Sequence, residues 1–330
     1  MKFQNCKNFG LKLIFVLSLI CLIAKISYTE ALANNDINIK QAKPAIPIAM
    51  SLDDGYTYPT IVSMTSIMEN ASETISYDFY IMHAPKFSKQ NKEKIMSLAK
   101  KYRRCKIKFI NMGQEYNKAN DKGHITTPAY YRLSLPEKLP NIDKIIYLDG
   151  DTLVSKGKNL QKMYDLKVDN LYCRGFLDDN RDRLKKFGIN CDKYICSGVM
   201  LMNLKSMRKD KIVQKFKEFI SKNNDRLNQH DQTVINYVCR GKIGELPPEY
   251  GMFNYSEQEE GWVKCFTHSY SAEELKRAFH NRTLIHYVCK PWWHPNAAYA
   301  KEWFSYAKKT GFFDEICKKY PDIGRVKSEL

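Results

Sequence analysis

The chain has 330 residues, of which 44% are hydrophobic and 12% aromatic, and it carries a formal net charge of +17. The apolar fraction excludes a wholly disordered chain, because it is sufficient for a large buried core. Ten cysteines in this length exclude a small scaffold held together by disulfides. The charge indicates an acidic partner, such as nucleic acid, a phosphorylated ligand or an anionic membrane, without choosing among them.

The N-terminal residues 1–33 have the three-part layout of a secretory signal peptide. A lysine-containing start precedes an uncharged apolar run over residues 13–24, and small residues follow at 31–33. This run is shorter than the ~20 residues of a membrane-spanning helix, which favours a cleaved signal over an uncleaved anchor. We expect the secretory pathway or the cell envelope, with membrane association on the cytoplasmic side as the alternative. Residues 34–44 are polar and are predicted to be a linker.

The sequence does not decide between the endoplasmic reticulum and a bacterial envelope. The last four residues, Lys-Ser-Glu-Leu, resemble an endoplasmic-reticulum retention signal, while a bacterial envelope protein fits the same leader. Eight cysteines follow the leader and none forms a C-x-x-C pair. This spacing argues against zinc-ribbon and thioredoxin-like sites, and leaves disulfides and ordinary buried thiols equally open.

From residue 45 onward, short apolar runs alternate with amphipathic stretches. Strands are expected at residues 45–52, 77–83, 106–110, 143–148 and 195–204, and helices at residues 88–102 and 206–221. This alternation predicts an α/β domain with a mostly parallel sheet flanked by helices. In such sheets, ligands bind at the carboxyl ends of the strands.

Two acidic clusters stand at predicted strand ends, Asp53-Asp54 and Asp149-Gly150-Asp151. In extended backbone, residues i and i+2 point the same way, so Asp149 and Asp151 are predicted to reach one hard cation. Gly150 would let a ligand approach the backbone closely. The plainer alternative is that Asp149 and Asp151 are ordinary acidic residues that face solvent in a turn at the end of the strand.

A second constellation lies where an apolar strand leads to His286, followed by Lys290, a proline and two tryptophans. Imidazole can bind a borderline metal ion, and an ammonium group can bind phosphate. Taken alone, a histidine beside aromatic residues is more often part of a core. Its interest here comes from the acidic motif elsewhere in the chain.

Two further stretches carry polar groups at unusual density. In residues 229–236, Asp231 and Gln232 stand at the start of an apolar helix, where a helix cap is the competing explanation. In residues 126–133, Arg132 lies in a short aromatic helix, where a lone arginine is usually a surface charge.

Taken in order, these motifs resemble glycosyltransferase family eight, the retaining transferases of the GT-A fold. The matching stretches are Asp53 to Tyr56, Tyr130 to Leu133, Tyr147 to Asp151, Ser197 to Asn203, Asp231-Gln232 and His286 to Trp292. The resemblance spans residues 45–293 and implies one GT-A domain there, with a mixed, mostly parallel sheet. Residues 294–330 are then expected to form a C-terminal helical tail.

The resemblance also implies an activity: transfer of a hexose, glucose or galactose, from a UDP-sugar to a glycan, lipid-linked or protein-linked acceptor. Asp149, Asp151 and His286 would bind Mn²⁺, or Mg²⁺, which would bridge the donor diphosphate. Donor binding is implied for Asp53 and Tyr56 at the uracil ring, and for Arg132, Gly150 and Lys290 towards the phosphates. Catalytic positions are implied for Asp231, Gln232 and Asp178 around the transferred sugar.

This chain departs from the family pattern at three places. Cys289 replaces a usual glycine, and two residues are missing between it and Lys290. Cys196 stands where many members have asparagine, and Gly55 replaces a frequent asparagine at the uracil site. Cys289 and Cys196 motivate one alternative, a nucleotide-sugar-binding relative with weak or no turnover.

A second alternative is a haloacid dehalogenase-like phosphatase, because residues 149–152 also fit its D-x-D-x-T motif. Those enzymes place the motif on the first strand of the domain, whereas about a hundred residues of α/β pattern precede it here. Nucleic-acid binding is not expected, since no recognised module appears. The leader carries +3 of the charge, so the lysines of the predicted helices would favour an anionic membrane surface or a phosphorylated acceptor.

Overall fold

The computed structural model describes residues 24, 25, 27, 44–117, 127–179, 181–227 and 230–326. Apart from a few positions, the predicted leader, the linker and the Lys-Ser-Glu-Leu end lie outside the described residues. Residues 45–330 form one compact unit, separate from residues 1–44. Within the described part of the chain, no helix is both long and apolar enough to cross a membrane.

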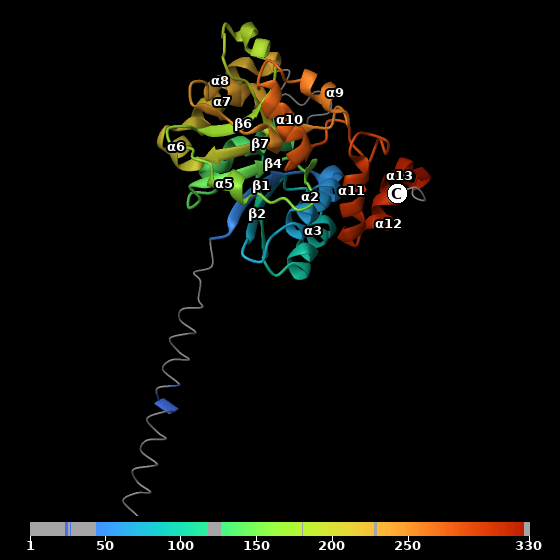
Figure 1. Cartoon of the computed structure of the whole chain (residues 1–330). Helices are drawn as coiled ribbons and strands as arrows, with labels where there is room; N and C mark the ends of the chain where they lie inside the picture. Colours follow the sequence, from blue (N-terminus) through green and yellow to red (C-terminus); the bar gives the residue numbers. More distant parts are fainter. Residues whose placement is uncertain are drawn as a thin grey trace, which may run out of the picture. The chain divides into compact units, whose positions relative to one another are not determined.

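Two β-sheets form the centre of the compact unit (Figure 1). The larger sheet has the order β3-β2-β1-β4-β7-β6-β8 and the smaller the order β5-β10-β9. The strands are β1 (Ile46–Ser51), β2 (Tyr77–His83), β3 (Cys105–Asn111), β4 (Lys144–Leu148), β5 (Thr152–Val154), β6 (Cys173–Leu177), β7 (Ile195–Asn203), β8 (Ile243–Glu245), β9 (Met252–Phe253) and β10 (Leu284–His286). In the larger sheet, only β7 runs antiparallel to its neighbours. The mixed, mostly parallel sheet of the prediction is confirmed.

Helices connect most of the strands. The α-helices are α2 (Thr57–Glu69), α3 (Lys89–Lys101), α4 (Leu135–Lys138), α5 (Gln161–Asp165), α6 (Leu204–Lys209), α7 (Ile212–Asn223), α8 (His230–Val238), α9 (Glu259–Lys264), α10 (Ala272–Asn281), α11 (Ala300–Ala307), α12 (Phe313–Lys319) and α13 (Pro321–Val326). The 3₁₀ turns are η1 (Asp54–Tyr56), η2 (Thr127–Ser134), η3 (Arg181–Phe187), η4 (Asn224–Arg226), η5 (Pro248–Tyr250) and η6 (Lys308–Thr310).

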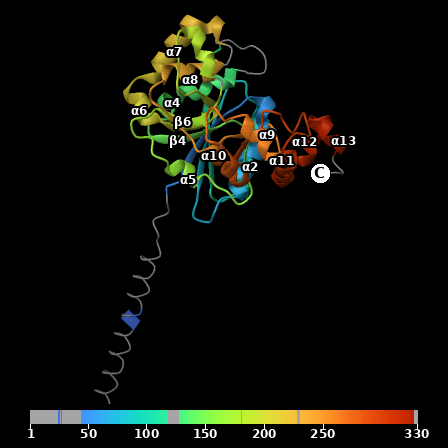
Figure 2. The same ribbon diagram turned by 45° about the horizontal axis from the view of Figure 1, so that its top comes forward.

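The central strands of the larger sheet are buried on both faces, as β1 and β4 show by being apolar and buried at nearly every position. Ile146 and Leu148 of β4 pack into one core with Ile61 and Met64 of α2. Ile145 and Tyr147, which alternate with them, pack into a second core with residues of α6, α7 and α8. Successive side chains of a strand point to opposite faces, so helices must cover both sides (Figure 2). This explains why the strands were predictable from continuous apolar runs.

The predicted helix over residues 206–221 is wrong as a single element. The structure breaks it between α6 and α7, where Lys211 adopts the left-handed region with φ of 52°. The apolar residues expected on one face are nevertheless buried, including Met207, Ile212 and Phe216. Periodicity indicated the buried face but not the turn within it. Cys105, Cys173, Cys196, Cys239, Cys265 and Cys289 are free thiols.

The C-terminal residues form helices that pack against the rest of the compact unit. Figures 1 and 2 show α11 beside α2, with α12 and α13 following towards the C-terminus. Trp303 and Phe304 of α11 are each 1% exposed, and Ile316 of α12 is fully buried. These helices are therefore part of the core.

Candidate functional site

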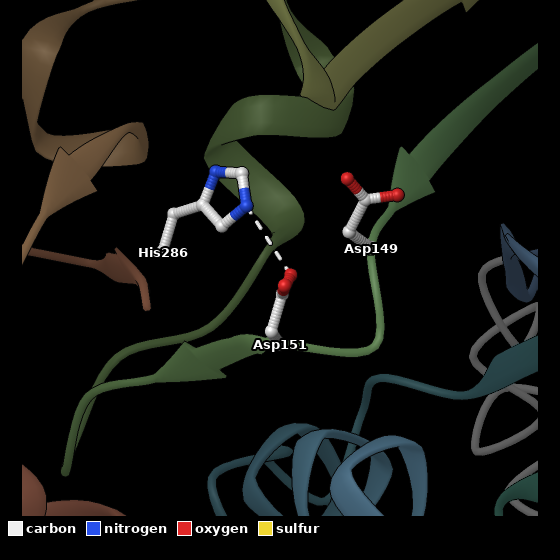
Figure 3. Close-up of side chains that lie close together, drawn as sticks. All are labelled: Asp149, Asp151 and His286. Carbon is white, nitrogen blue, oxygen red and sulfur yellow. Dashed lines mark ion pairs between the residues drawn. The ribbon is translucent and has the colours of Figure 1, made fainter. Parts of the chain in front are cut away.

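A tight turn after β4 carries the predicted acidic pair. The main-chain N–H and the side-chain hydroxyl of Thr152 both donate to the carbonyl oxygen of Asp149, at 3.2 and 2.8 Å. The chain therefore reverses over residues 149–152 and continues as β5. The prediction of extended backbone here is wrong, although its outcome holds, because the turn also brings the two carboxylates together (Figure 3).

His286 reaches these carboxylates through strand pairing. Strand β10 pairs antiparallel with β5, and its register sets His286 opposite Thr152. One ligand atom from each of Asp149, Asp151 and His286 lies within 4.8 Å of the other two. The distance between His286 Nε2 and Asp151 Oδ1 is 3.2 Å (Figure 3). Residues far apart in sequence thus form one cluster at the carboxyl end of β4.

This cluster has the properties of a divalent-metal site. Asp151 Oδ1 is buried and accepts no hydrogen bond from the described residues. Two carboxylates and an imidazole suit Mn²⁺ and do not exclude Mg²⁺. Gly198 of β7 adds a further fit, because a Cβ there would lie 2.6 Å from Asp149 Oδ2 and 2.4 Å from His286 Cε1. The absence of a side chain keeps the space between these ligands open.

Lysine and histidine charges surround Asp151. Lys290 Nζ donates to Asp151 Oδ2 and to the carbonyl oxygen of Tyr287. Burial opposes ionisation of Asp151, but the Lys290 and His286 charges hold its pKa below the ordinary value. Burial alone would lower the pKa of His286, yet the Asp151 carboxylate raises it to about 10. Positive side chains thus neutralise a carboxylate that a bound cation would also neutralise.

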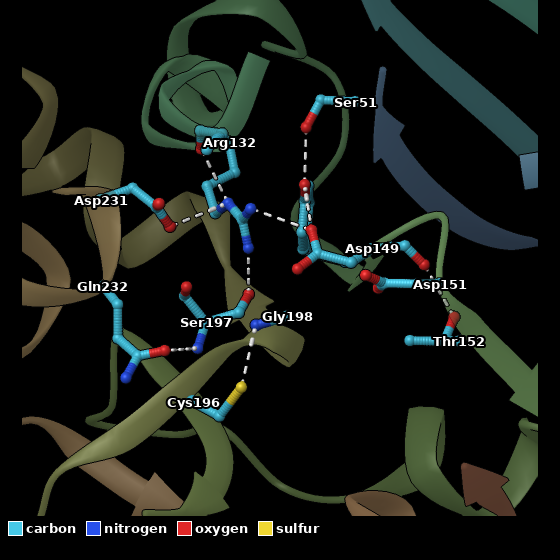
Figure 4. Close-up of polar contacts among 12 residues, drawn as sticks. Ser51, Arg132, Asp149, Asp151, Thr152, Cys196, Ser197, Gly198, Asp231 and Gln232 are labelled. Carbon is cyan, nitrogen blue, oxygen red and sulfur yellow. Dashed lines mark hydrogen bonds and ion pairs between the residues drawn. The ribbon is translucent and has the colours of Figure 1, made fainter. Parts of the chain in front are cut away.

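Arg132 is buried at the centre of the site, at 3% exposure. The competing explanation of a surface charge is excluded, because Arg132 of η2 is buried. Its guanidinium donates to Asp149 Oδ1 at 2.9 Å and to the carbonyl oxygen of Ser197, and it lies over the Tyr147 ring. Asp231 Oδ2 lies 3.1 Å from Nε. Figure 4 shows Arg132 between the two carboxylates.

The contact between Arg132 and Asp231 is mainly electrostatic. The Arg132 Nε–H points to the carbonyl oxygen of Ala129 at 2.9 Å, so Asp231 Oδ2 receives no directed hydrogen bond despite its proximity. Burial raises the pKa of Asp231 to about 6, although Arg132 opposes the shift. Asp231 stands in the first turn of α8, as predicted, and its side chain faces the site interior.

Gln232, next on α8, links three segments. Its side-chain oxygen accepts from the Ser197 N–H at 3.2 Å (Figure 4). Its Nε2 donates to Asp178 Oδ2 at 3.2 Å. Asp178 follows β6 directly. The amide of Gln232 is therefore held in a defined orientation between β7 and the end of β6.

The loop after β1 forms another wall. Asp53 caps η1 by accepting from the Tyr56 N–H at 3.2 Å. The Tyr56 ring meets Trp292 edge to face, with centroids 5.9 Å apart. Gly150 packs against α2, where a Cβ would lie 2.4 Å from Thr60 Oγ1. Packing within the protein therefore requires glycine at this position, independently of any ligand.

A cleft of about 590 Å³ joins these groups. All predicted site residues except Asp178 line it, and Asp178 is reached through Gln232. Gly198 and Tyr147 were not predicted to be site residues. Tyr147 donates to Asp149 Oδ1 at 2.9 Å, and its place two residues before Asp149 on the same strand was an available signal. Gln229 and the first residue of the predicted 126–133 helix lie outside the described residues.

Comparisons with known proteins agree with this geometry. The sequence model of Glycosyl transferase family 8 matches residues 47–295. A protein of Haemophilus influenzae whose name assigns it to the glycosyltransferases is 31% identical over 226 residues, which cover 66% of this chain and 65% of the relative. A lipopolysaccharide 1,2-glucosyltransferase of Escherichia coli is 28% identical over 265 residues, which cover 77% of this chain and 74% of the relative.

A solved structure shows the same fold. The galactosyltransferase LgtC, determined in complex with donor and acceptor sugar analogues, superimposes with a TM-score of 0.67 and 22% identity. The superposition covers 80% of this chain and 96% of LgtC. This likeness identifies the GT-A fold. Because the family model spans well over half of the chain, the protein belongs to glycosyl transferase family 8.

Proposed function

We propose that this protein is a metal-dependent, retaining glycosyltransferase that moves glucose or galactose from a UDP-sugar to a glycan, lipid-linked or protein-linked acceptor. The observation that carries the proposal is the convergence of Asp149, Asp151 and His286 inside a cleft of about 590 Å³, with Asp151 Oδ1 buried and 3.2 Å from His286 Nε2. Family membership disfavours the phosphatase alternative, and the motif follows β4 instead of the first strand.

The chemistry requires a stabilised leaving group. A nucleoside diphosphate leaves readily only when its developing negative charge is neutralised, and a bound divalent cation would supply that stabilisation here. Lys290 lies beside Asp151 and adds a positive charge at the same place. Tyr56 and Asp53 stand at the end of β1 in the same cleft, where they would bind the uracil ring.

The residues beside the transferred sugar favour attack from the same face as the leaving phosphate. Gln232 is a poor nucleophile, and its amide is held by Ser197 and Asp178. Asp231 faces the Arg132 guanidinium. We therefore assign Asp231 and Gln232 to substrate positioning, with Asp178 orienting the amide of Gln232.

The relatives and the predicted leader bear on the acceptor and the location. The names of the relatives, a lipopolysaccharide glucosyltransferase and a galactosyltransferase, favour a glycan or lipid-linked acceptor. The predicted leader is consistent with action in the secretory pathway or the cell envelope. The lysine-rich helices of the folded chain, such as α3, would favour an anionic membrane surface.

The test uses the full chain with Mn²⁺ and a panel of nucleotide sugars. We expect slow hydrolysis of UDP-glucose or UDP-galactose, abolished by Asp151→Asn. Asp143→Asn is the matched control, because exposed Asp143 stands just before the other end of β4 and pairs with Arg208. Hydrolysis in Asp151→Asn equal to that of the wild type, or none with any donor, would contradict the proposal. Donor binding without turnover would indicate the binding-only relative.

A further inference from the structure

We infer that the end of α12 positions the donor-binding loop, so that Lys319 and Tyr320 contribute to recognition of the uridine part of the donor. This inference rests on the proposed function. We call Glu315, Lys319 and Tyr320 the C-terminal brace. The family match ends at residue 295, so the brace lies outside the matched segment of the chain.

The brace holds main-chain atoms of the loop after β1. The Tyr320 hydroxyl donates to the carbonyl oxygen of Gly55 at 3.2 Å. Lys319 Nζ donates to the carbonyl oxygens of Asp54 and Gly55, both at 3.2 Å. These carbonyls belong to η1, which runs directly into α2 at Thr57. The brace thus holds the backbone that carries Asp53 and Tyr56.

The loop is held from the opposite side as well. Asp54 Oδ1 accepts from the Ser88 N–H at 3.1 Å and from Asn91 Nδ2 at 2.6 Å, at the start of α3. One side of η1 is therefore tied to α3 and the other to α12. A loop with both ties has little freedom to change the distance between Asp53 and Tyr56.

The brace is itself anchored in the core. Glu315 accepts from the Tyr58 hydroxyl at 2.8 Å and pairs with Lys94, which joins α12 to α2 and α3. Trp292, which is 1% exposed, lies between Tyr56 and Tyr320, with ring centroids at 5.9 and 6.4 Å. The position of the Tyr56 ring therefore depends on packing that includes the C-terminal helices. Binding to a preorganised loop loses less conformational entropy.

The experiment compares Tyr320→Phe, Lys319→Met and the double variant by calorimetric titration of the full chain with UDP and with ADP in the presence of Mn²⁺. Tyr306→Phe and Lys318→Met are matched controls. Tyr306 lies in α11 and accepts from Asn70 at 2.7 Å, and exposed Lys318 precedes Lys319 in α12. Lys319→Arg keeps the hydrogen-bond donors and should bind UDP like the wild type.

We expect the double variant to bind UDP about tenfold more weakly, the effect of ~1.4 kcal/mol. The ratio of UDP to ADP affinity should shrink, while Mn²⁺ affinity without nucleotide stays unchanged. In the hydrolysis assay, KM for the donor should rise more than kcat falls. Unchanged UDP affinity in the double variant, or equal losses for UDP, ADP and Mn²⁺, would overturn the inference. A wild-type protein that binds no uridine nucleotide would overturn the proposed donor, and this inference with it.

Discussion

Substituting Gly198 by alanine tests whether Asp149, Asp151 and His286 hold a metal ion. Gly198 lies in β7, between β4 and β6, and its carbonyl oxygen accepts from the Asp149 N–H at 2.8 Å. The backbone there is fixed by neighbouring strands on both sides. An added methyl group must therefore displace the side chains that it meets.

The structure sets the size of this displacement. The new Cβ would lie 2.4 Å from His286 Cε1 and 2.6 Å from Asp149 Oδ2, whereas ordinary contact begins at 3.4 Å. The two ligands must retreat by close to 1 Å, which exceeds the tolerance of about 0.2 Å in metal–ligand distances. We expect Mn²⁺ affinity to fall at least tenfold, comparable to losses of ~10–100-fold on disturbing the residues that orient metal ligands. Overpacking should cost about 1–3 kcal/mol of unfolding free energy.

The assay is Mn²⁺ titration followed by electron paramagnetic resonance, with urea unfolding in parallel. Gly175→Ala is the matched control, because Gly175 lies in β6, the strand next to β7. A Cβ there would lie 2.8 Å from Ile195 Cβ and would meet no metal ligand. We expect a similar loss of stability with unchanged Mn²⁺ affinity. Wild-type Mn²⁺ affinity in Gly198→Ala would refute the assignment of the metal site. An equal loss of Mn²⁺ affinity in Gly175→Ala would refute the explanation by a direct clash with the metal ligands.

Three further substitutions test the electrostatics of the site. Arg132→Met leaves Asp149 and Asp231 without their shared cation. Urea unfolding should therefore show that the free energy of unfolding falls by about 3–5 kcal/mol, and a fall under about 1 kcal/mol would contradict this. Asp231→Asn removes a carboxyl whose pKa burial raises from 3.8 to about 6. The native wild type therefore holds this proton more tightly than the unfolded chain, and its stability should fall relative to the variant by up to ~3 kcal/mol between about pH 4 and 6. A difference independent of pH would disprove that effect. Lys290→Met removes a cation that would compete with Mn²⁺ for Asp151. Mn²⁺ should therefore bind more tightly without nucleotide, while KM for the donor rises. Weaker Mn²⁺ binding would argue against competition between Lys290 and the metal at Asp151.

The strands and much of the cleft were predictable because their signals are local. A strand buried on both faces is a continuous apolar run, as in β1 and β4, and polar residues directly after it must lie at the sheet edge. Asp53, Asp149 and Asp151 were recognised on this basis. Nearly all of the residues to which the family resemblance assigned a role line one cleft.

Other features escaped prediction because they depend on distant partners. The burial of Arg132 results from the carbonyl oxygen of Ser197 and the carboxylates of Asp149 and Asp231 around it. The break at Lys211 follows from a backbone turn that apolar periodicity does not record. Gly198 lies in the stretch Ser197 to Asn203 that carries part of the family resemblance, but its contact with the metal ligands appears only in the structure, beside His286.

The amino-acid sequence by itself determined the α/β class, the positions of the main strands and the residues able to bind a metal ion, since hydrophobic burial and chemical type act residue by residue. It also indicated that the charge of +17 belongs mainly to the chain after the leader. Only the tertiary structure decided how these charges are used. Lys290 lies against Asp151, Lys319 against the loop after β1, and Arg132 between two carboxylates. Such contacts arise from strand pairing and helix packing between segments far apart in the chain, and no local pattern encodes their distances.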